Sequence, residues 1–130
     1  MSNNDPLANV LSHILNYERV GNKAVVTTNN SRVIKGVLQI MQDGGYIGGY
    51  EETEDSKGNI LTINLIGAIN KCGVIKPRFS FTFEDIEKME KKYLPSKGFG
   101  IIIVSTSRGI MTIEDAKKNK LGGRLVAYCY

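Results

Sequence analysis

Apolar and polar residues alternate at helical spacing in two segments of the N-terminal half. The first segment follows Asp5-Pro6, where Asp suits a helix cap and Pro suits the first turn. The second follows Asn29-Asn30-Ser31, which supplies a turn and a cap, and Gly44-Gly45 ends it. The apolar positions are Leu7, Val10, Leu11, Ile14 and Leu15 in the first segment, and Val33, Ile34, Val37, Leu38 and Met41 in the second. This spacing predicts two amphipathic helices.

Three shorter segments of the same half have the composition of β-strands. Residues 23–28 contain several β-branched side chains, and residues 46–52 and 60–66 flank a polar turn at 55–59. The acidic residues 51–55 are expected at the solvated tip of this hairpin. The order of elements is therefore helix, strand, helix, strand and strand.

A joint follows this half at the glycine-containing residues 67–73. It divides the chain into two predicted lobes, an N-terminal α+β lobe at 1–68 and a C-terminal strand-rich lobe at 69–130. The predicted fold class is α+β.

The second half opens with a clean alternation that predicts a strand over residues 75–83. One face carries Ile75, Pro77, Phe79, Phe81 and Phe83, and the other carries Lys76, Arg78, Ser80 and Thr82. Pro77 places this strand at an edge or a bulge, because proline has no N–H to donate.

A helix and two further strands complete the predicted C-terminal lobe. Thr82 and Asp85 have the spacing of a capping box for a helix with Ile86, Met89 and Tyr93 inward, which Pro95 stops. Residues 99–104 are continuously apolar and predict a strand buried on both faces. A polar loop at 105–109 and a short helix capped by Thr112 lead to a last strand at 124–130.

Composition limits the functions that this sequence can carry. The chain has 130 residues and a formal net charge of +4, which suits a polyanionic partner such as nucleic acid. Cys72 and Cys129 are far apart in sequence and there is one histidine, so no familiar zinc spacing occurs, and we expect reduced thiols in a reducing cytoplasm. No secretory leader or membrane-spanning run is visible, which predicts a cytoplasmic protein.

Enzymatic motifs are missing from the sequence. There is no phosphate loop, no nucleophile elbow, and Gly98-Phe99-Gly100 lacks the third glycine of a dinucleotide fingerprint. His13 has no acid placed by local spacing to orient it. We therefore expect no enzyme activity, no cofactor, no metal and no small-molecule substrate.

Three groups of residues suit RNA. Lys76 and Arg78 lie in a row with Ser80 and Thr82, and such a row suits phosphates and sugars, although a solvent-facing strand has the same pattern. The second group presents short hydroxyls after a stiff strand, and such hydroxyls suit base edges and ribose hydroxyls. Ser and Thr are, however, more commonly used in a polar turn that precedes a helix cap. This second group consists of Ser105, Thr106, Ser107, Arg108 and Gly109. The third is Gly122-Gly123, where missing side chains would let the backbone approach the polymer.

The order of these motifs resembles the small-subunit ribosomal protein eight family in its archaeal or eukaryotic form. The resemblance covers nearly the whole chain, and its most specific block is Ser105-Thr106-Ser107 with Gly109 and Met111. The other matching residues are Asp5-Pro6-Leu7-Ala8, Asn70 to Phe79, Leu94-Pro95, Phe99-Gly100-Ile101, Gly122-Gly123 and Ala127-Tyr128. The chain departs from the family at Ile113, where archaeal relatives tend to carry His, and at Cys129, where Val is usual.

The resemblance implies a structural constituent of the small ribosomal subunit. Such a protein binds the central domain of small-subunit rRNA as a primary binder and helps assemble the platform beside neighbouring ribosomal proteins. It also implies that residues 105–107 and Gly122-Gly123 contact an irregular rRNA helix, and that the N-terminal lobe touches a second rRNA segment, assigned here to Asn9 and Lys35. Two other functions stay open: a free RNA-binding translational repressor, and a small nucleotide-dependent enzyme using Ser107 or His13.

Overall fold

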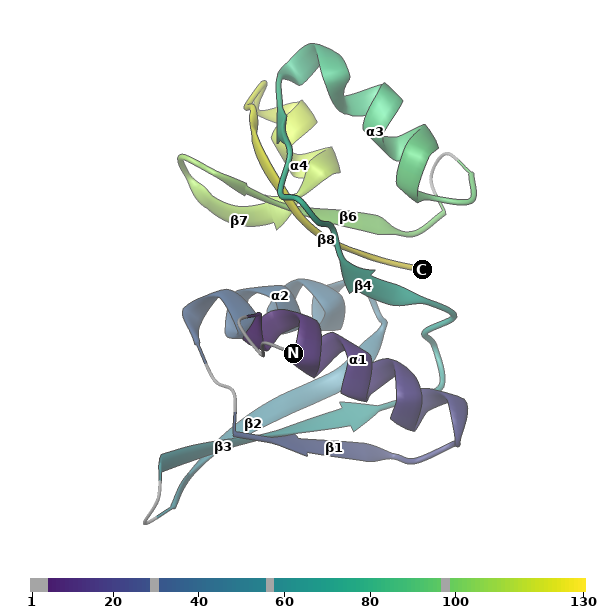
Figure 1. Ribbon diagram of the computed structural model, residues 1–130, viewed down its shortest axis with the longest axis vertical. Coiled ribbons are helices and arrows are strands. Elements are labelled where there is room, and N and C mark those ends of the chain that lie inside the picture. Colours follow the sequence, from purple (N-terminus) through teal and green to yellow (C-terminus); the bar gives the residue numbers. More distant parts are fainter. Residues whose placement is uncertain (1–4, 29–30, 56–57, 97–98) are drawn as a thin grey trace. The chain divides into compact units, whose positions relative to one another are not determined.

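A computed structural model of the protein describes residues 5–28, 31–55, 58–96 and 99–130 (Figure 1). The chain forms two compact units, an N-terminal unit at Met1–Lys71 and a C-terminal unit at Cys72–Tyr130. Each unit mixes helices with an antiparallel sheet, which confirms the α+β class. Within the described residues, no helix is long and apolar enough to cross a membrane.

The N-terminal unit has the predicted order of helix, strand, helix, strand and strand. Its elements are α1 (Pro6–Arg19), β1 (Ala24–Thr27), α2 (Arg32–Asp43), β2 (Ile47–Asp55) and β3 (Gly58–Leu65). Both helices begin at the predicted caps, because the Asp5 carboxylate accepts from the Ala8 amide at 3.2 Å and the Ser31 hydroxyl accepts from the Ile34 amide at 3.3 Å. Asn29 and Asn30 lie outside the described residues.

The sheet of this unit has the antiparallel order β1–β3–β2, and α1 and α2 lie on one of its faces (Figure 1). The apolar stripes of both helices are buried, with the exceptions of half-buried Leu15 and exposed Val33. The buried stripe residues are Leu7, Val10, Leu11, Ile14, Ile34, Val37, Leu38 and Met41. The helical periodicity of the sequence therefore located this core.

The hairpin of the N-terminal unit is longer than the sequence pattern predicted. β2 runs to Asp55 and β3 begins at Gly58, so residues 51–54, which we had expected at the tip, pair within a strand. The predicted turn at 55–59 was therefore too wide. A ladder uses backbone groups, so polar side chains at exposed positions do not end it. Ser56 and Lys57 lie outside the described residues.

The C-terminal unit is built around its last strand. The elements are β4 (Cys72–Val74), β5 (Ser80–Phe81), a 3₁₀ turn (Phe83–Asp85), α3 (Ile86–Tyr93), β6 (Ile101–Thr106), β7 (Gly109–Thr112), α4 (Ile113–Lys118) and β8 (Gly123–Cys129). The sheet order is β4–β8–β6–β7, and β5 pairs with β8 as well. Thus β8 joins segments that are distant in the sequence.

One apolar cluster holds the sheet of this unit against its helices. Its buried members are Ile75, Phe81, Ile86, Leu94, Ile102, Val104, Ile113, Ala116 and Leu125. The helical elements begin at the predicted caps. The Asp85 carboxylate accepts from the Thr82 amide at 3.0 Å, and the Thr112 hydroxyl accepts from the Asp115 amide at 3.1 Å. Both capping predictions are therefore confirmed.

The predicted strand over 75–83 is wrong. Only Ser80–Phe81 pairs as a strand in that range, while Phe79 and Phe83 are 42% and 40% exposed. Pro77 has no N–H for a ladder, and its carbonyl accepts from the Phe79 amide at 2.8 Å in a tight turn. The alternation of the sequence therefore does not correspond to one continuous strand.

Two further boundaries in this unit differ from prediction. The buried strand begins at Ile101 instead of residue 99, and Phe99 is 48% exposed. Its central residues 102–104 are fully buried, as expected for a strand covered on both faces. Strand β7 was not predicted, because its apolar residues, Ile110 and Met111, are too few to show an alternation.

Candidate nucleic-acid interface

A polar row crosses three strands of the C-terminal sheet. Arg124 in β8 is the register partner of both Ser105 in β6 and Ser80 in β5. Directly paired residues of antiparallel strands project to the same face, with Cβ atoms about 5 Å apart. All three side chains are exposed. The sheet therefore presents a hydroxyl, a guanidinium and a second hydroxyl side by side, named here the serine–arginine row.

The opposite face of the same strands is part of the apolar core. Val104, Phe81 and Leu125 are neighbours of the row in sequence, and their side chains are buried in the cluster described above. Successive residues of a strand point to opposite faces. The serine–arginine row therefore stands on a rigid, packed base.

A tight turn continues the polar surface at the end of β6. The structure corrects the predicted loop at 105–109, because Ser105 and Thr106 belong to β6, Gly109 belongs to β7, and only Ser107 and Arg108 connect them. The Thr106 hydroxyl accepts from the Arg108 amide at 3.1 Å and donates to the Gly109 carbonyl at 3.0 Å. Ser107 and Arg108 are exposed. Thr106 therefore shapes the turn, and Ser107 and Arg108 face solvent.

The Gly122-Gly123 pair has a packing role that the sequence did not reveal. A Cβ atom on Gly122 would lie 2.7 Å from the Phe81 carbonyl oxygen, and one on Gly123 would collide with the Ser105 carbonyl oxygen. The missing side chains thus allow close contact within the protein's own sheet, where we had expected them to admit RNA. Contact of these glycines with RNA stays a prediction.

Lys76 and Arg78 are exposed, but they do not share a strand face with Ser80. They lie in the segment between β4 and β5, on either side of Pro77. The predicted four-residue polar face is therefore divided: Ser80 joins the serine–arginine row, and Thr82 caps the following helix.

The two candidates in the N-terminal unit have other surroundings. Asn9 is half-buried in α1. Lys35 in α2 forms an ion pair with Glu52 of β2 at 2.8 Å, and this hydrogen bond, together with one from Asn59, lowers the pKa of the Glu52 carboxyl. The charge of Lys35 is therefore partly neutralised within its own unit.

The residues considered for other chemistry are also placed. His13 is exposed on α1, and its ring stacks on Tyr17 at 6.5 Å between centroids. Cys72 and Cys129, distant in sequence, are buried register partners across β4 and β8. In the described part of the chain, no three His, Cys, Asp or Glu side chains gather into a group that could hold a metal ion.

Sequence reasoning did not connect Ser80 with Arg124. These residues are 44 positions apart, counted from 124 to 80, and only the pairing of β5 with β8 brings them together. The local signal was present for each residue alone, as a hydroxyl on an alternating segment and a cation after two glycines. The register that makes them neighbours becomes visible only in the folded sheet.

An antiparallel sheet that presents fixed hydroxyls and arginines on a packed base defines a small α+β protein with a surface suited to RNA. The family model of Ribosomal protein S8 matches residues 5–130, and the chain belongs to this family. It is therefore a protein of the small ribosomal subunit that binds rRNA and acts in translation.

Proposed function

We propose that this protein binds the central domain of small-subunit rRNA as a primary binder and helps assemble the platform of the subunit in the cytoplasm. The observation that supports this proposal most directly is the serine–arginine row on a rigid sheet. Fixed donors and acceptors suit a folded RNA of defined shape, because they need no reordering when the RNA arrives. The protein acts as a scaffold for RNA and catalyses no reaction.

The residues of the C-terminal unit take two roles in this proposal. Arg108 and Arg124, together with Lys76 and Arg78, attract phosphates independently of sequence. Ser105 and Ser107 offer short hydroxyls to base edges and ribose 2′-hydroxyls, and these two serines therefore supply selectivity. The turn and close strand packing that hold them are supplied by Thr106, Gly109, Gly122 and Gly123.

The N-terminal unit contributes a second, weaker contact. We assign Asn9 and Lys35 to it, and the ion pair of Lys35 with Glu52 means that RNA must compete with a carboxylate for this ammonium group. A competing internal partner reduces the affinity that a phosphate contact can add. The C-terminal unit therefore provides most of the affinity.

Binding to separate rRNA domains tests the proposal. The protein is titrated with central-domain RNA and, in parallel, with fragments of the other small-subunit rRNA domains at one stated salt concentration. We expect the central domain to bind at least about tenfold more tightly, as specific sites exceed non-specific ones. Equal affinities would contradict the assignment.

Variants connect this test to the proposed surface. Arg108→Ala with Arg124→Ala should weaken central-domain binding, whereas Lys91→Ala, which removes an exposed charge from α3, should not. Co-sedimentation then separates a resident of the subunit from a free regulatory RNA-binding protein. Recovery of the chain with assembled small subunits supports the proposal, and recovery only with a messenger RNA would contradict it.

A further inference from the structure

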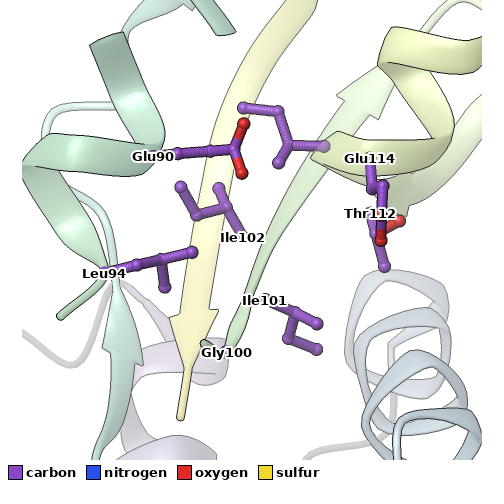
Figure 2. A pocket seen from close by; sticks show the side chains of 8 residues that line it. Glu90, Leu94, Gly100, Ile101, Ile102, Thr112 and Glu114 are labelled. Carbon is purple, nitrogen blue, oxygen red and sulfur yellow. The ribbon is translucent and has the colours of Figure 1, made fainter. Parts of the chain in front are cut away.

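A small pocket lies in the C-terminal unit beside the first residues of β6 (Figure 2). It has a volume of about 110 Å³, below the 300–1,000 Å³ typical of cofactor and drug-sized ligand sites. The lining residues are Glu90, Leu94, Gly100, Ile101, Ile102, Thr112, Ile113 and Glu114. This pocket, named here the β6 pocket, has room for one side chain rather than a cofactor.

The β6 pocket combines an apolar floor with two carboxylates. Leu94, Ile102 and Ile113 are buried members of the apolar cluster. Figure 2 shows Glu90 on α3 at one side and Glu114 at the start of α4 on the other side. The pocket therefore offers apolar contact below and negative charge at opposite edges.

Among the residues that the structure describes, the side chains of Glu90 and Glu114 have no hydrogen bond or ion pair, whereas Glu87 on the same helix lies 3.7 Å from Lys117. The third polar side chain of the lining, Thr112, already accepts from the Asp115 amide. A positively charged occupant would therefore meet two carboxylates that no described side chain pairs, half-buried Glu90 and exposed Glu114.

These features select the chemistry of the occupant. RNA phosphates are repelled by two carboxylates, and a neutral apolar group would form no ion pair with either of them. A guanidinium group is planar and weakly hydrated, carries five donors that can serve two carboxylates, and has an aliphatic stem that suits an isoleucine floor. Arginine fits both parts of the pocket.

We propose that the β6 pocket binds the side chain of an arginine carried by a neighbouring ribosomal protein. We choose a protein as the partner because membership of a ribosomal family implies other ribosomal proteins as partners, and the acidic edges disfavour RNA phosphates. The pocket lies near Ile101, four residues along β6 from Ser105, which is about 13 Å at the rise of a strand. Protein and RNA would therefore contact opposite ends of one strand.

A peptide titration tests the chemistry of the pocket. The full chain, with labelled isoleucine and leucine methyl groups, is titrated with acetyl-Gly-Arg-Gly-amide and followed by NMR. We expect saturable shifts at Leu94, Ile102 and Ile113. The same peptide with citrulline in place of arginine keeps the shape and loses the charge, so its binding should be at least about tenfold weaker.

Matched variants test the two carboxylates. Glu90→Gln with Glu114→Gln should abolish the methyl shifts, while Glu84→Gln, which removes an exposed carboxylate outside the pocket lining, should preserve them. Equal melting temperatures for the three proteins would show that the fold is intact. Equal binding of the arginine and citrulline peptides, no shifts at all, or full binding by the pocket variant would each overturn the proposal.

Assembled subunits test the protein partner. Small subunits reconstituted with each protein are washed at rising salt, and their protein content is measured by mass spectrometry. The pocket variant should release one neighbouring protein at lower salt than wild type or Glu84→Gln. If the arginine peptide binds but no neighbour is released, the pocket binds small cations only and the proposed partner is wrong. Affinity for central-domain RNA is measured separately and should be unchanged, so this outcome is distinct from failure of the proposed RNA function.

Discussion

The candidate RNA-binding cations of the two units differ in their internal partners. In the C-terminal unit, Arg108 and Arg124 are exposed and, within the described residues, have no ion-pair partner. In the N-terminal unit, Lys35 is held by Glu52 at 2.8 Å. A cation without an internal partner is available to a phosphate at once, whereas a paired cation must first give up its carboxylate. Basic residues that count equally in the net charge can therefore differ in their availability to a phosphate.

The largest expected effect concerns the packing beneath the C-terminal surface. Gly123→Ala should destabilise the protein by about 3 kcal/mol, because its Cβ atom collides with the Ser105 carbonyl oxygen. Hydrogen exchange should accelerate in β6 and β8, and the free energy of unfolding from urea titration measures the destabilisation. Gly44→Ala in the N-terminal unit, where the nearest atoms belong to the Tyr46 ring at 3.1 Å, is the control with a smaller cost. Equal effects of the two substitutions would show that the close contact of β6 with β8 is not required.

The second prediction concerns the exposed arginines. Replacing Arg108 and Arg124 with Ala should weaken binding to central-domain RNA and reduce the log–log salt slope by about 0.9 for each phosphate that the variant no longer neutralises. Lys35→Ala should change the slope less, because part of that charge is already neutralised. Fluorescence anisotropy over a series of salt concentrations provides both slopes. A larger effect of Lys35→Ala would reverse the comparison between the units.

The third prediction concerns the exposed hydroxyl at the β6–β7 turn. Ser107→Ala should cost about 1 kcal/mol of binding to the cognate rRNA, the typical net value of one hydrogen bond. No charge is removed, so the salt slope should stay constant, and an unrelated hairpin should bind as before. Thr106→Ala is an informative comparison, since its hydroxyl bonds inside the turn and its removal should lower the melting temperature as well. Equal weakening for every RNA would assign Ser107 a structural role.

The smallest effect should be found at Glu18 of α1. Partial burial raises the pKa of its carboxyl, and a hydrogen bond from the Gly67 amide opposes that shift in part. A raised pKa favours the protonated form in the folded state, so this contribution to stability is present below the unfolded pKa and is lost as pH rises through the folded pKa. Glu18→Gln should therefore make the fall of melting temperature shallower as pH rises above the ordinary carboxyl pKa of about 4.5. Parallel pH profiles for the two proteins would rule out this contribution.

Local signals predicted much of the fold. Asp5, Ser31, Thr82 and Thr112 each precede an apolar repeat at helical spacing, and all four lie at the start of a helical element in the structure. Such signals act over three or four residues, so one sequence contains them completely.

The arrangement of the candidate surface depends on distant pairing and could not be predicted in the same way. Ser105 and Arg124 become neighbours only through the register of β6 with β8. The sequence alone suggests that Gly123 lets RNA approach the backbone. It does not reveal that the Ser105 carbonyl fills this space, because Ser105 lies 18 positions earlier, counted from 123 to 105. The length of the turn after β6 was overestimated because β7 is short and half-buried, so its residues show no strand pattern in the sequence.

The position of β8 in its sheet also affects how the protein matures as it is synthesised. β4 and β5 pair only with β8 in the described sheet, so both strands lack a partner until residues 123–129 have been translated. The N-terminal unit, whose strands pair among residues 24–65, needs no later segment and can fold first. Arg124 arrives with β8, and the serine–arginine row therefore comes into existence in the same step that closes the sheet. Under the proposed function, a nascent chain that is still incomplete would offer RNA no finished surface, and rRNA would be captured only after the second unit has folded.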